Sequence, residues 1–182
     1  THEGFKLPQL DEHIDMDGGA LSISRYFTEM LDPAMTWEDV AGMVREWGGQ
    51  FCLKGIMSVE DARKAVEIGC TGIILSNHGG RQLDGAVAPL RVLPQVAEAA
   101  RGMTVILDGG VRRGTDVLKA LALGADFVFL GRPFLYAASV GGEAGVRHAI
   151  ELLSSEVGRD MALMGVSDLS EVRPELLTRT RG

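Results

Sequence analysis

The chain has 182 residues, of which 46% are hydrophobic and 24% are charged, a composition typical of one globular domain with its own core. Its formal net charge of −7 argues against general nucleic-acid binding, so we expect no nucleic-acid partner. The longest apolar runs, such as Phe127–Leu130, are too short to span a bilayer. The two cysteines, Cys52 and Cys70, are expected to be reduced core thiols, which fits a cytoplasmic protein.

Residues 1–35 differ from the remainder of the chain. They are polar, are interrupted by glycine and proline, and lack a sustained hydrophobic period, so we expect a long loop with one helical stretch around Ser24–Met30. Regular patterning begins at Thr36, which is a suitable N-cap for a helix over Trp37–Trp47. The expected organisation is therefore a leader over residues 1–35 and a domain over residues 36–182.

A strand followed by a helix repeats along residues 50–164. The strands are apolar on both faces, as in a parallel sheet that helices cover. The pattern predicts strands over 50–54, 72–76, 103–108 and 126–130, and helices over 58–68, 89–101, 113–123, 133–139 and 143–164. Four such βα units fit either half of a (β/α)8 barrel or a small open sheet, because a complete barrel needs about 250 residues.

The segment Ser76–Asp84 carries the residues best suited to catalysis. Two glycines separate His78 from Arg81, and both follow a predicted strand at the end where parallel α/β proteins place their chemistry. A histidine can move a proton near neutral pH, and an arginine can bind a carboxylate through two hydrogen bonds. The pair predicts proton abstraction from a substrate with a carboxylate, and the alternative is an ordinary loop histidine beside a surface charge.

Two glycine turns predict a phosphate site. The segment Asp108–Gly114 ends a strand and opens a helix whose first amides would face an anion, with Arg112 adding charge. The turn after the last strand repeats this logic with Gly131 and Arg132, and the last two loops of a barrel often bind phosphate. The alternative is two ordinary turns with surface arginines. Lys54 ends the first strand, where it is either solvated or stabilises negative charge on a cofactor or substrate.

These segments resemble the motifs of a known family, the FMN-dependent 2-hydroxy acid dehydrogenases and oxidases, which includes L-lactate dehydrogenase, glycolate oxidase and mandelate dehydrogenase. The resemblance covers most of residues 36–172, and residues 27–37 and 82–85 are most similar to bacterial membrane-associated L-lactate dehydrogenases. It implies a (β/α)8 TIM barrel, of which this chain supplies the second half. The similarity lies in five motifs: Leu53–Gly55, Ser76–Asp84, Asp108–Asp116, Lys119–Ala125 and Leu130–Arg132.

The resemblance also implies an activity, the FMN-dependent oxidation of an (S)-2-hydroxy acid, with L-lactate as the expected substrate, to the 2-oxo acid. His78 would be the base and Arg81 would bind the substrate carboxylate. Nine residues are expected to contact the FMN: Lys54, Ser76, His78 and Arg81 around the ring, and Asp108, Gly110, Arg112, Gly131 and Arg132 at the ribityl chain and phosphate.

Partners follow from the same resemblance. In the family the first half of the barrel supplies tyrosines near the substrate, a second carboxylate-binding arginine and the aspartate that orients the histidine. We therefore expect a missing N-terminal barrel half as partner, little turnover by this chain alone, and a homo-oligomer, which is a tetramer in the family. The expected location is the cytoplasm, with a peripheral contact on the inner membrane as an alternative.

Two other functions stay open at this point. One is another FMN- or phosphate-binding barrel, such as type 2 isopentenyl diphosphate isomerase, which has similar phosphate-binding turns. The other is an inactive half-barrel fragment that associates with itself, because half a barrel exposes two sheet edges and apolar core. The loop with His78 and Arg81 favours the 2-hydroxy acid reaction, because an isomerase has no need of that pair.

Overall fold

The structure is a computed structural model that describes Arg25, Glu29, Met30 and residues 32–178. The chain divides into two compact units, Thr1–Val40 and Ala41–Gly182, and the division falls inside helix α2 (Trp37–Trp47). In the first unit, Arg25, Glu29 and Met30 are helical, in agreement with the helical stretch expected there. The remainder of that stretch and the expected leader before it lie outside the described residues.

Helix α2 has the bounds that the sequence predicts, and hydrogen bonds between Thr36 and Asp39 explain where it begins. The amide of Asp39 donates to Oγ1 of Thr36 at 3.3 Å, and the amide of Thr36 donates to Oδ2 of Asp39 at 2.7 Å. This reciprocal pair satisfies amides that the first turn of a helix leaves without partners. The hydroxyl of Thr36 also donates to Oδ2 of Asp39 at 2.7 Å, and this hydrogen bond, together with the one from the Thr36 amide, lowers the pKa of the Asp39 carboxyl below its ordinary value.

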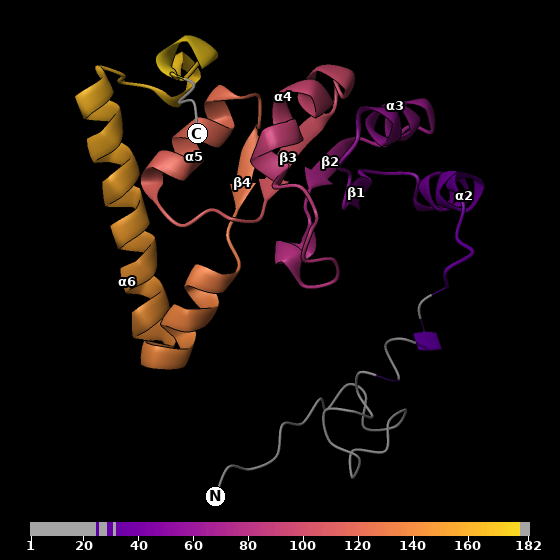
Figure 1. Cartoon of the computed structure of the whole chain (residues 1–182), viewed down its shortest axis with the longest axis horizontal. Helices are drawn as coiled ribbons and strands as arrows, with labels where there is room; N and C mark the ends of the chain where they lie inside the picture. The colour runs from indigo at the N-terminus through magenta and orange to yellow at the C-terminus, as the bar shows by residue number, and fades with distance from the viewer. Residues whose placement is uncertain (1–24, 26–28, 31, 179–182) are drawn as a thin grey trace, which may run out of the picture. The chain divides into compact units, whose positions relative to one another are not determined.

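Four parallel strands form the sheet of the second unit, in the order β1-β2-β3-β4 (Figure 1). Leu53 is in register with Ile73, and Ile73 with Val105, so neighbouring strands run side by side in chain order. The observed strands are β1 (Cys52–Lys54), β2 (Gly72–Leu75), β3 (Thr104–Asp108) and β4 (Phe127–Phe129). All four predicted strands are therefore confirmed, each slightly shorter than expected.

A helix follows each strand, as the βα repeat predicts. These helices are α3 (Val59–Glu67), α4 (Pro89–Ala99), α5 (Gly114–Ala122) and α6 (Arg132–Met164). Helix α3 packs on α4, α4 packs on β3, and α6 runs alongside α5, as Figure 1 shows. Ser58 caps α3 by accepting the amide of Asp61 at 3.0 Å, in agreement with the expected helix start.

Helix α6 consists of two helical segments. Gly142 interrupts it with φ 56° and ψ −140°, a backbone conformation that only glycine adopts without strain. This break explains why the sequence predicts two helices, over 133–139 and 143–164, in the same stretch. After Gly165 the tail contains two short 3₁₀ turns, Leu169–Glu171 and Pro174–Leu176. No helix within the described part of the chain is long and apolar enough to cross a membrane.

The core lies between the sheet and its helices. The strands contribute apolar side chains that are less than 5% exposed, and the helices cover them with small and branched residues. The core side chains include Ile73, Leu75, Val105 and Leu107 from the sheet, and Ala62, Ala65, Leu93, Val96 and Leu118 from the helices. A parallel sheet packed in this way carries its polar residues at the strand ends, which is where the candidate site lies.

The two cysteines do not share the environment expected for them. Cys70 is buried, but Cys52, on β1 at the edge of the described sheet, is exposed. The expectation that both are core thiols is therefore wrong for Cys52. Both thiols are free, and burial raises the pKa of each above its ordinary value.

Candidate functional site

The C-terminal ends of the four parallel strands meet at one edge of the sheet. Lys54 ends β1, Ser76 follows β2, and Asp108 ends β3. The Nζ atom of Lys54 lies 2.9 Å from Oγ of Ser76 and 2.8 Å from Oδ2 of Asp108, and Ser76 Oγ donates to the same carboxylate oxygen at 3.0 Å. Three predicted site residues from three strands are thus brought into one cluster.

The three members of this cluster differ in exposure. The side chain of Ser76 is buried, that of Asp108 is 24% exposed, and that of Lys54 is 43% exposed. The ammonium of Lys54 has three N–H groups, and the two contacts described leave one of them for a ligand. The hydrogen bond and the ion pair of Asp108 with the described residues both use Oδ2, which leaves Oδ1 as an acceptor.

His78 follows this cluster directly and has an uncommon backbone conformation. Its φ is 55°, and it is the one non-glycine residue with positive φ in the described part of the chain. The amide of His78 donates to Oγ of Ser76 at 3.1 Å. A Cβ atom placed on Gly55 would lie 3.3 Å from Cε1 of His78, so the imidazole lies over the residue after Lys54.

Asn77 holds the next part of this loop, which forms the short 3₁₀ turn η3 (His78–Gly80). Its Oδ1 atom accepts the amide of Gly79 at 3.0 Å, and its Nδ2 atom donates to the carbonyl of Val87 at 3.3 Å. Sequence reasoning gave Asn77 no role of its own. The available signal was an asparagine before two glycines, because asparagine side chains commonly accept the amide two residues further on.

Arg81 lies on the same loop as His78, and the structure does not bring its side chain into the cluster. Its backbone amide donates to the carbonyl of His78 at 3.4 Å, which closes the turn. The side chain is exposed, and its guanidinium makes no hydrogen bond or ion pair with the residues that the structure describes. The guanidinium is therefore free to bind a carboxylate from outside the chain.

A pocket of about 320 Å³ opens beside the loop of His78. On one side Arg132 donates from Nη2 to the carbonyl of Gly79 at 2.9 Å, so the turn after β4 contacts the loop after β2. A Cβ atom on Gly110 or Gly131 would meet nothing within 4 Å, so ligand atoms can approach the backbone there closely. The residues lining the pocket include Asn77, Gly79, Gly80, Gly109, Gly110, Asp116 and Arg132.

The first amides of α5 are already in use, in contrast to the expectation that they face an anion. The amide of Gly114 donates to Oε2 of Glu156 at 2.8 Å. The amides of Arg112 and Arg113 donate to Oδ2 of Asp116 at 3.0 and 3.1 Å. The chain's own carboxylates therefore occupy this helix start, and the donors left for a phosphate are the glycine backbone and the arginine side chains.

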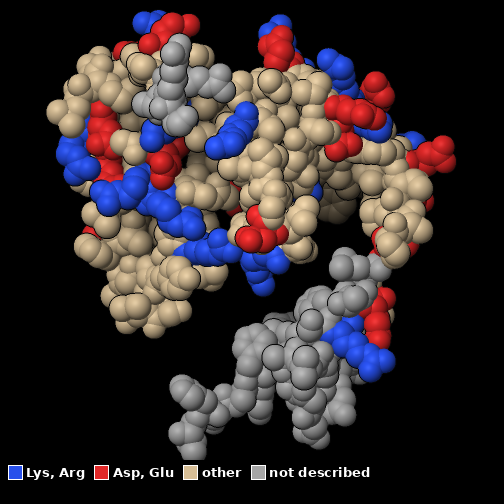
Figure 2. Space-filling view, viewed as in Figure 1, with Lys and Arg blue, Asp and Glu red and all other residues tan. Residues whose placement is uncertain are grey.

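Positive charge gathers on this face. Figure 2 shows a band of basic side chains in the region where the loop between β3 and α5 lies in Figure 1. Arg112 is exposed on that loop, where its Nη1 atom donates to the carbonyl of Val111 at 2.9 Å, but it does not line the pocket. Of the two predicted phosphate-binding arginines, Arg132 is the one that lines this pocket.

The comparisons with known proteins identify the family of this chain. The family model of the FMN-dependent dehydrogenases matches residues 5–179. The chain belongs to this family. It is 48% identical to L-lactate oxidase of Nostoc sp. over 178 residues, which cover 97% of this chain and 47% of that protein. It is 45% identical to L-lactate dehydrogenase of Pseudomonas aeruginosa over 153 residues, 84% of this chain and 40% of that protein.

Solved structures give the same family and the fold. The crystal structure of the monotopic membrane protein (S)-mandelate dehydrogenase matches with a TM-score of 0.82 and 38% identity, covering 88% of this chain and 43% of that chain. The expected α/β fold and family are thereby confirmed. The chain spans less than half the length of these relatives.

The residues present fit FMN, on which the family depends. FMN offers a phosphate, a hydroxylated chain and ring carbonyls. Arg132 and the open backbone at Gly110 and Gly131 suit the phosphate, Oδ1 of Asp108 suits a hydroxyl, and the remaining N–H of Lys54 suits a carbonyl. No cluster of His, Cys, Asp or Glu in the described ranges could hold a metal ion.

Proposed function

We propose that the whole protein oxidises an (S)-2-hydroxy acid, L-lactate first among them, to the 2-oxo acid with FMN as cofactor, and that this segment supplies the base and much of the cofactor site. The observation that carries the proposal is the cluster of Lys54, Ser76 and Asp108 at the strand ends, with His78 bonded to it. The relatives named L-lactate oxidase and L-lactate dehydrogenase support lactate as substrate.

Each side chain at the site has a role that its chemistry allows. Arg81 binds the substrate carboxylate through its free guanidinium, which fixes the α-carbon. His78 takes a proton from the substrate as two electrons leave it, so that a 2-hydroxy acid loses two electrons and two protons to become the 2-oxo acid. FMN, when bound, would accept the two electrons together with the second proton. The ammonium of Lys54 stabilises the negative charge that then develops beside it.

The cofactor phosphate is assigned to the glycine turns. Arg132 lines the pocket and is held there by the carbonyl of Gly79. Gly110 and Gly131 provide the open backbone, and Arg112 adds positive charge from the exposed side of the same loop. We assign Asp108 to the ribityl hydroxyls, because one of its carboxylate oxygens has no partner in the cluster.

The partner of this segment is proposed to be the remaining half of a (β/α)8 barrel. Strands β1 and β4 are the edges of the described sheet, and Phe127 and Phe129 on β4 are 58% and 48% exposed. Four further parallel strands between β4 and β1 would close the sheet and cover these rings. The coverage of the relatives supports this, and we propose a homo-oligomer in the cytoplasm, with peripheral membrane contact as the alternative.

The test uses the full-length protein, loaded with FMN and mixed anaerobically with L-lactate. We expect the visible flavin band to bleach, and we expect His78→Asn to slow the bleaching by about 10²–10⁴-fold because it removes the base. The matched control is His148→Asn, which makes the same change at an exposed position on α6 and should bleach at the parent rate. Equal rates for His78→Asn and the parent protein would overturn the assignment of the base.

A further inference from the structure

We propose that Glu156 is a positioning residue for the cofactor phosphate: from α6 it fixes the start of α5 and thereby the shape of the glycine loop over residues 109–113. The part of the proposal that concerns the ligand rests on the proposed function, in which this loop binds the phosphate of FMN. Glu156 does not line the pocket itself, so it acts through the loop. The part that concerns the loop depends only on contacts within the chain.

The carboxylate of Glu156 is held through both of its oxygens. Its side chain is 7% exposed, and Oε2 accepts the amide of Gly114 at 2.8 Å. Oε1 pairs with Nη2 of Arg113, also at 2.8 Å. A buried carboxylate is costly unless it is paired and hydrogen-bonded, so this arrangement favours keeping both partners in place. These partners are the last residue of the loop and the first residue of α5.

The part of the loop that lines the pocket is adaptable by composition. It begins with Gly109 and Gly110, which have φ values of 107° and 83°. Its upstream end is fixed, because Asp108 contacts both Lys54 and Ser76. Glycine has more backbone freedom to lose than any other residue, so a loop that opens with two glycines depends on its fixed ends for a single shape. Glu156 supplies the downstream end.

Asp116 also bonds this loop, but its contacts have a different consequence. Its Oδ2 atom accepts the amides of Arg112 and Arg113 at 3.0 and 3.1 Å. Because Asp116 belongs to α5 itself, these bonds shape the turn without joining it to another element. Glu156 follows Gly114 by 42 residues and lies on another helix, so its hydrogen bond joins the turn to α6.

The charge of Glu156 allows the proposal to be tested by the sign of an effect. A carboxylate near the glycine turns repels a phosphate, so removing the charge alone would strengthen FMN binding. Loss of positioning weakens FMN binding, because the loop must then be ordered when the ligand binds. Glu156→Ala and Glu156→Gln both remove the charge, but glutamine keeps an oxygen that can accept the amide of Gly114. A difference between the two variants therefore reports the lost acceptor.

The first test compares FMN with riboflavin, which lacks the phosphate, by fluorescence titration of the full-length protein. In Glu156→Ala we expect FMN to bind about tenfold more weakly and riboflavin to stay within about twofold of the parent. Glu156→Gln should bind FMN at least as tightly as the parent. If the alanine variant does not fold, Glu156→Met takes its place, because methionine has a similar length and no oxygen acceptor.

The control for a general loss of stability is Leu118→Ala. Leu118 is buried on α5 and does not line the pocket, so this change weakens the core without removing either contact of Glu156. The ratio of the FMN and riboflavin dissociation constants should stay at the parent value in this variant. A role of Glu156 in stability alone would give the same result for Glu156→Ala.

The second test measures hydrogen exchange by mass spectrometry on the full-length protein without cofactor. In Glu156→Ala a peptide over residues 109–115 should exchange about tenfold faster, while a peptide over residues 72–76 stays within about twofold of the parent. Glu156→Gln should resemble the parent in both peptides. This measurement reports the hold on the loop directly and does not require a bound flavin.

The outcomes are separable. FMN binding that is unchanged or stronger in Glu156→Ala would overturn the proposal, and so would equal weakening in Glu156→Ala and Glu156→Gln. Equal weakening of FMN and riboflavin would also overturn it, because the effect would not concern the phosphate. A parent protein that does not bind FMN would refute the proposed function and the cofactor part of this inference, and hydrogen exchange would still decide whether Glu156 fixes the loop.

Discussion

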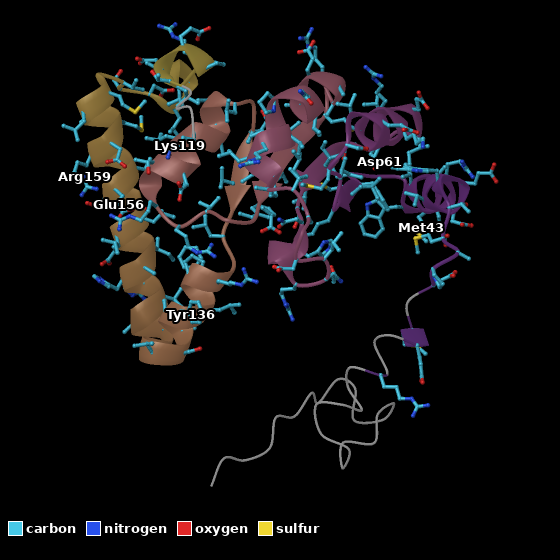
Figure 3. All side chains as sticks on the ribbon, in the orientation of Figure 1. Met43, Asp61, Lys119, Tyr136, Glu156 and Arg159 are labelled. Carbon is cyan, nitrogen blue, oxygen red and sulfur yellow. The ribbon has the colours of Figure 1, made fainter. Side chains whose placement is uncertain are left out.

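The carboxylate of Glu156 on α6 accepts the backbone amide of Gly114, the first residue of α5, at 2.8 Å. The same carboxylate pairs with Arg113 through Nη2 at 2.8 Å, and it is 7% exposed. Figure 3 labels Glu156 on α6, the helix that packs against α5. The loop that contains the pocket-lining residues Gly109 and Gly110 is therefore held, where it joins α5, by Glu156 of α6.

This anchor predicts a difference between two substitutions of Glu156. Glu156→Ala leaves the amide of Gly114 without its partner in a buried place, and we expect a loss of about 1–3 kcal/mol in the free energy of unfolding. Glu156→Gln keeps an acceptor for that amide and should lose less. Urea unfolding of both variants measures this, with Glu151→Ala at an exposed position of α6 as the control. Equal losses for the two Glu156 variants would show that the ion pair, not the amide, dominates.

Helices α5 and α6 approach each other closely at Gly114, so a methyl group added there is expected to lower the stability of the protein. A Cβ atom on Gly114 would lie 2.7 Å from the backbone nitrogen of Val157, so Gly114→Ala must push the two helices apart. We expect a destabilisation of about 1–3 kcal/mol, measured by urea unfolding.

The matched control is Gly158→Ala on α6, where a Cβ atom would meet nothing within 4 Å. That change should be neutral or stabilise the protein by up to about 1 kcal/mol, because alanine favours a helix interior over glycine. A Gly114→Ala variant as stable as Gly158→Ala would contradict the packing described.

The phosphate assignment predicts a change in selectivity between FMN and riboflavin, which lacks the phosphate. In the full-length protein, Arg132→Gln should weaken FMN binding by about tenfold or more and leave riboflavin binding nearly unchanged. Arg101→Gln is the control, because Arg101 pairs with Glu98 on an exposed helix end. Fluorescence titration measures both ligands. Equal weakening for the two flavins would place Arg132 away from the phosphate.

The raised pKa values of the thiols predict slow alkylation. Burial favours the neutral thiol of Cys52 and Cys70, so less thiolate is present at a given pH than in a free cysteine. We expect iodoacetamide at pH 8 to modify both more slowly than a cysteine peptide, and exposed Cys52 faster than buried Cys70. Mass spectrometry of timed samples checks this order.

The same shifts have a consequence for stability. A pKa that is raised in the folded state gives stability that is present below the unfolded value and is lost as the pH rises through the folded value. The thiols therefore contribute to a decline in the free energy of unfolding above about pH 9. Urea unfolding across the alkaline range measures it, and Cys70→Ser, which removes the buried thiol, should flatten the decline.

Much of the fold could be predicted from the sequence because local signals agree with the tertiary structure. Apolar runs marked the strands, Ser58 marked a helix start, and two separate helical patterns over 133–139 and 143–164 marked the two segments of α6. The exposure of Cys52 could not be predicted, because it depends on what packs against that side of β1 rather than on the residues of the strand itself.

For the candidate site, sequence reasoning named residues at the strand ends but not the contacts between them. Lys54, Ser76 and Asp108 were each placed at a strand end, and the parallel sheet brings them together. The contacts of the Ser76 hydroxyl with Lys54 and Asp108, and the place of Glu156 at the start of α5, follow only from distances between segments far apart in the chain. The spacing of residues along the sequence does not show which hydrogen-bond donor pairs with which acceptor.

The left-handed backbone of His78 limits how the activities of a library of substitutions at this position can be interpreted. Glycine, asparagine and aspartate accept φ 55° at low cost, whereas valine, isoleucine and threonine do not. If a clone with a branched residue at this position is inactive, the loss has two causes that cannot be separated: the distorted turn and the missing base. A screen restricted to the permissive set separates the two, since those clones keep the turn and differ from the parent in the imidazole alone.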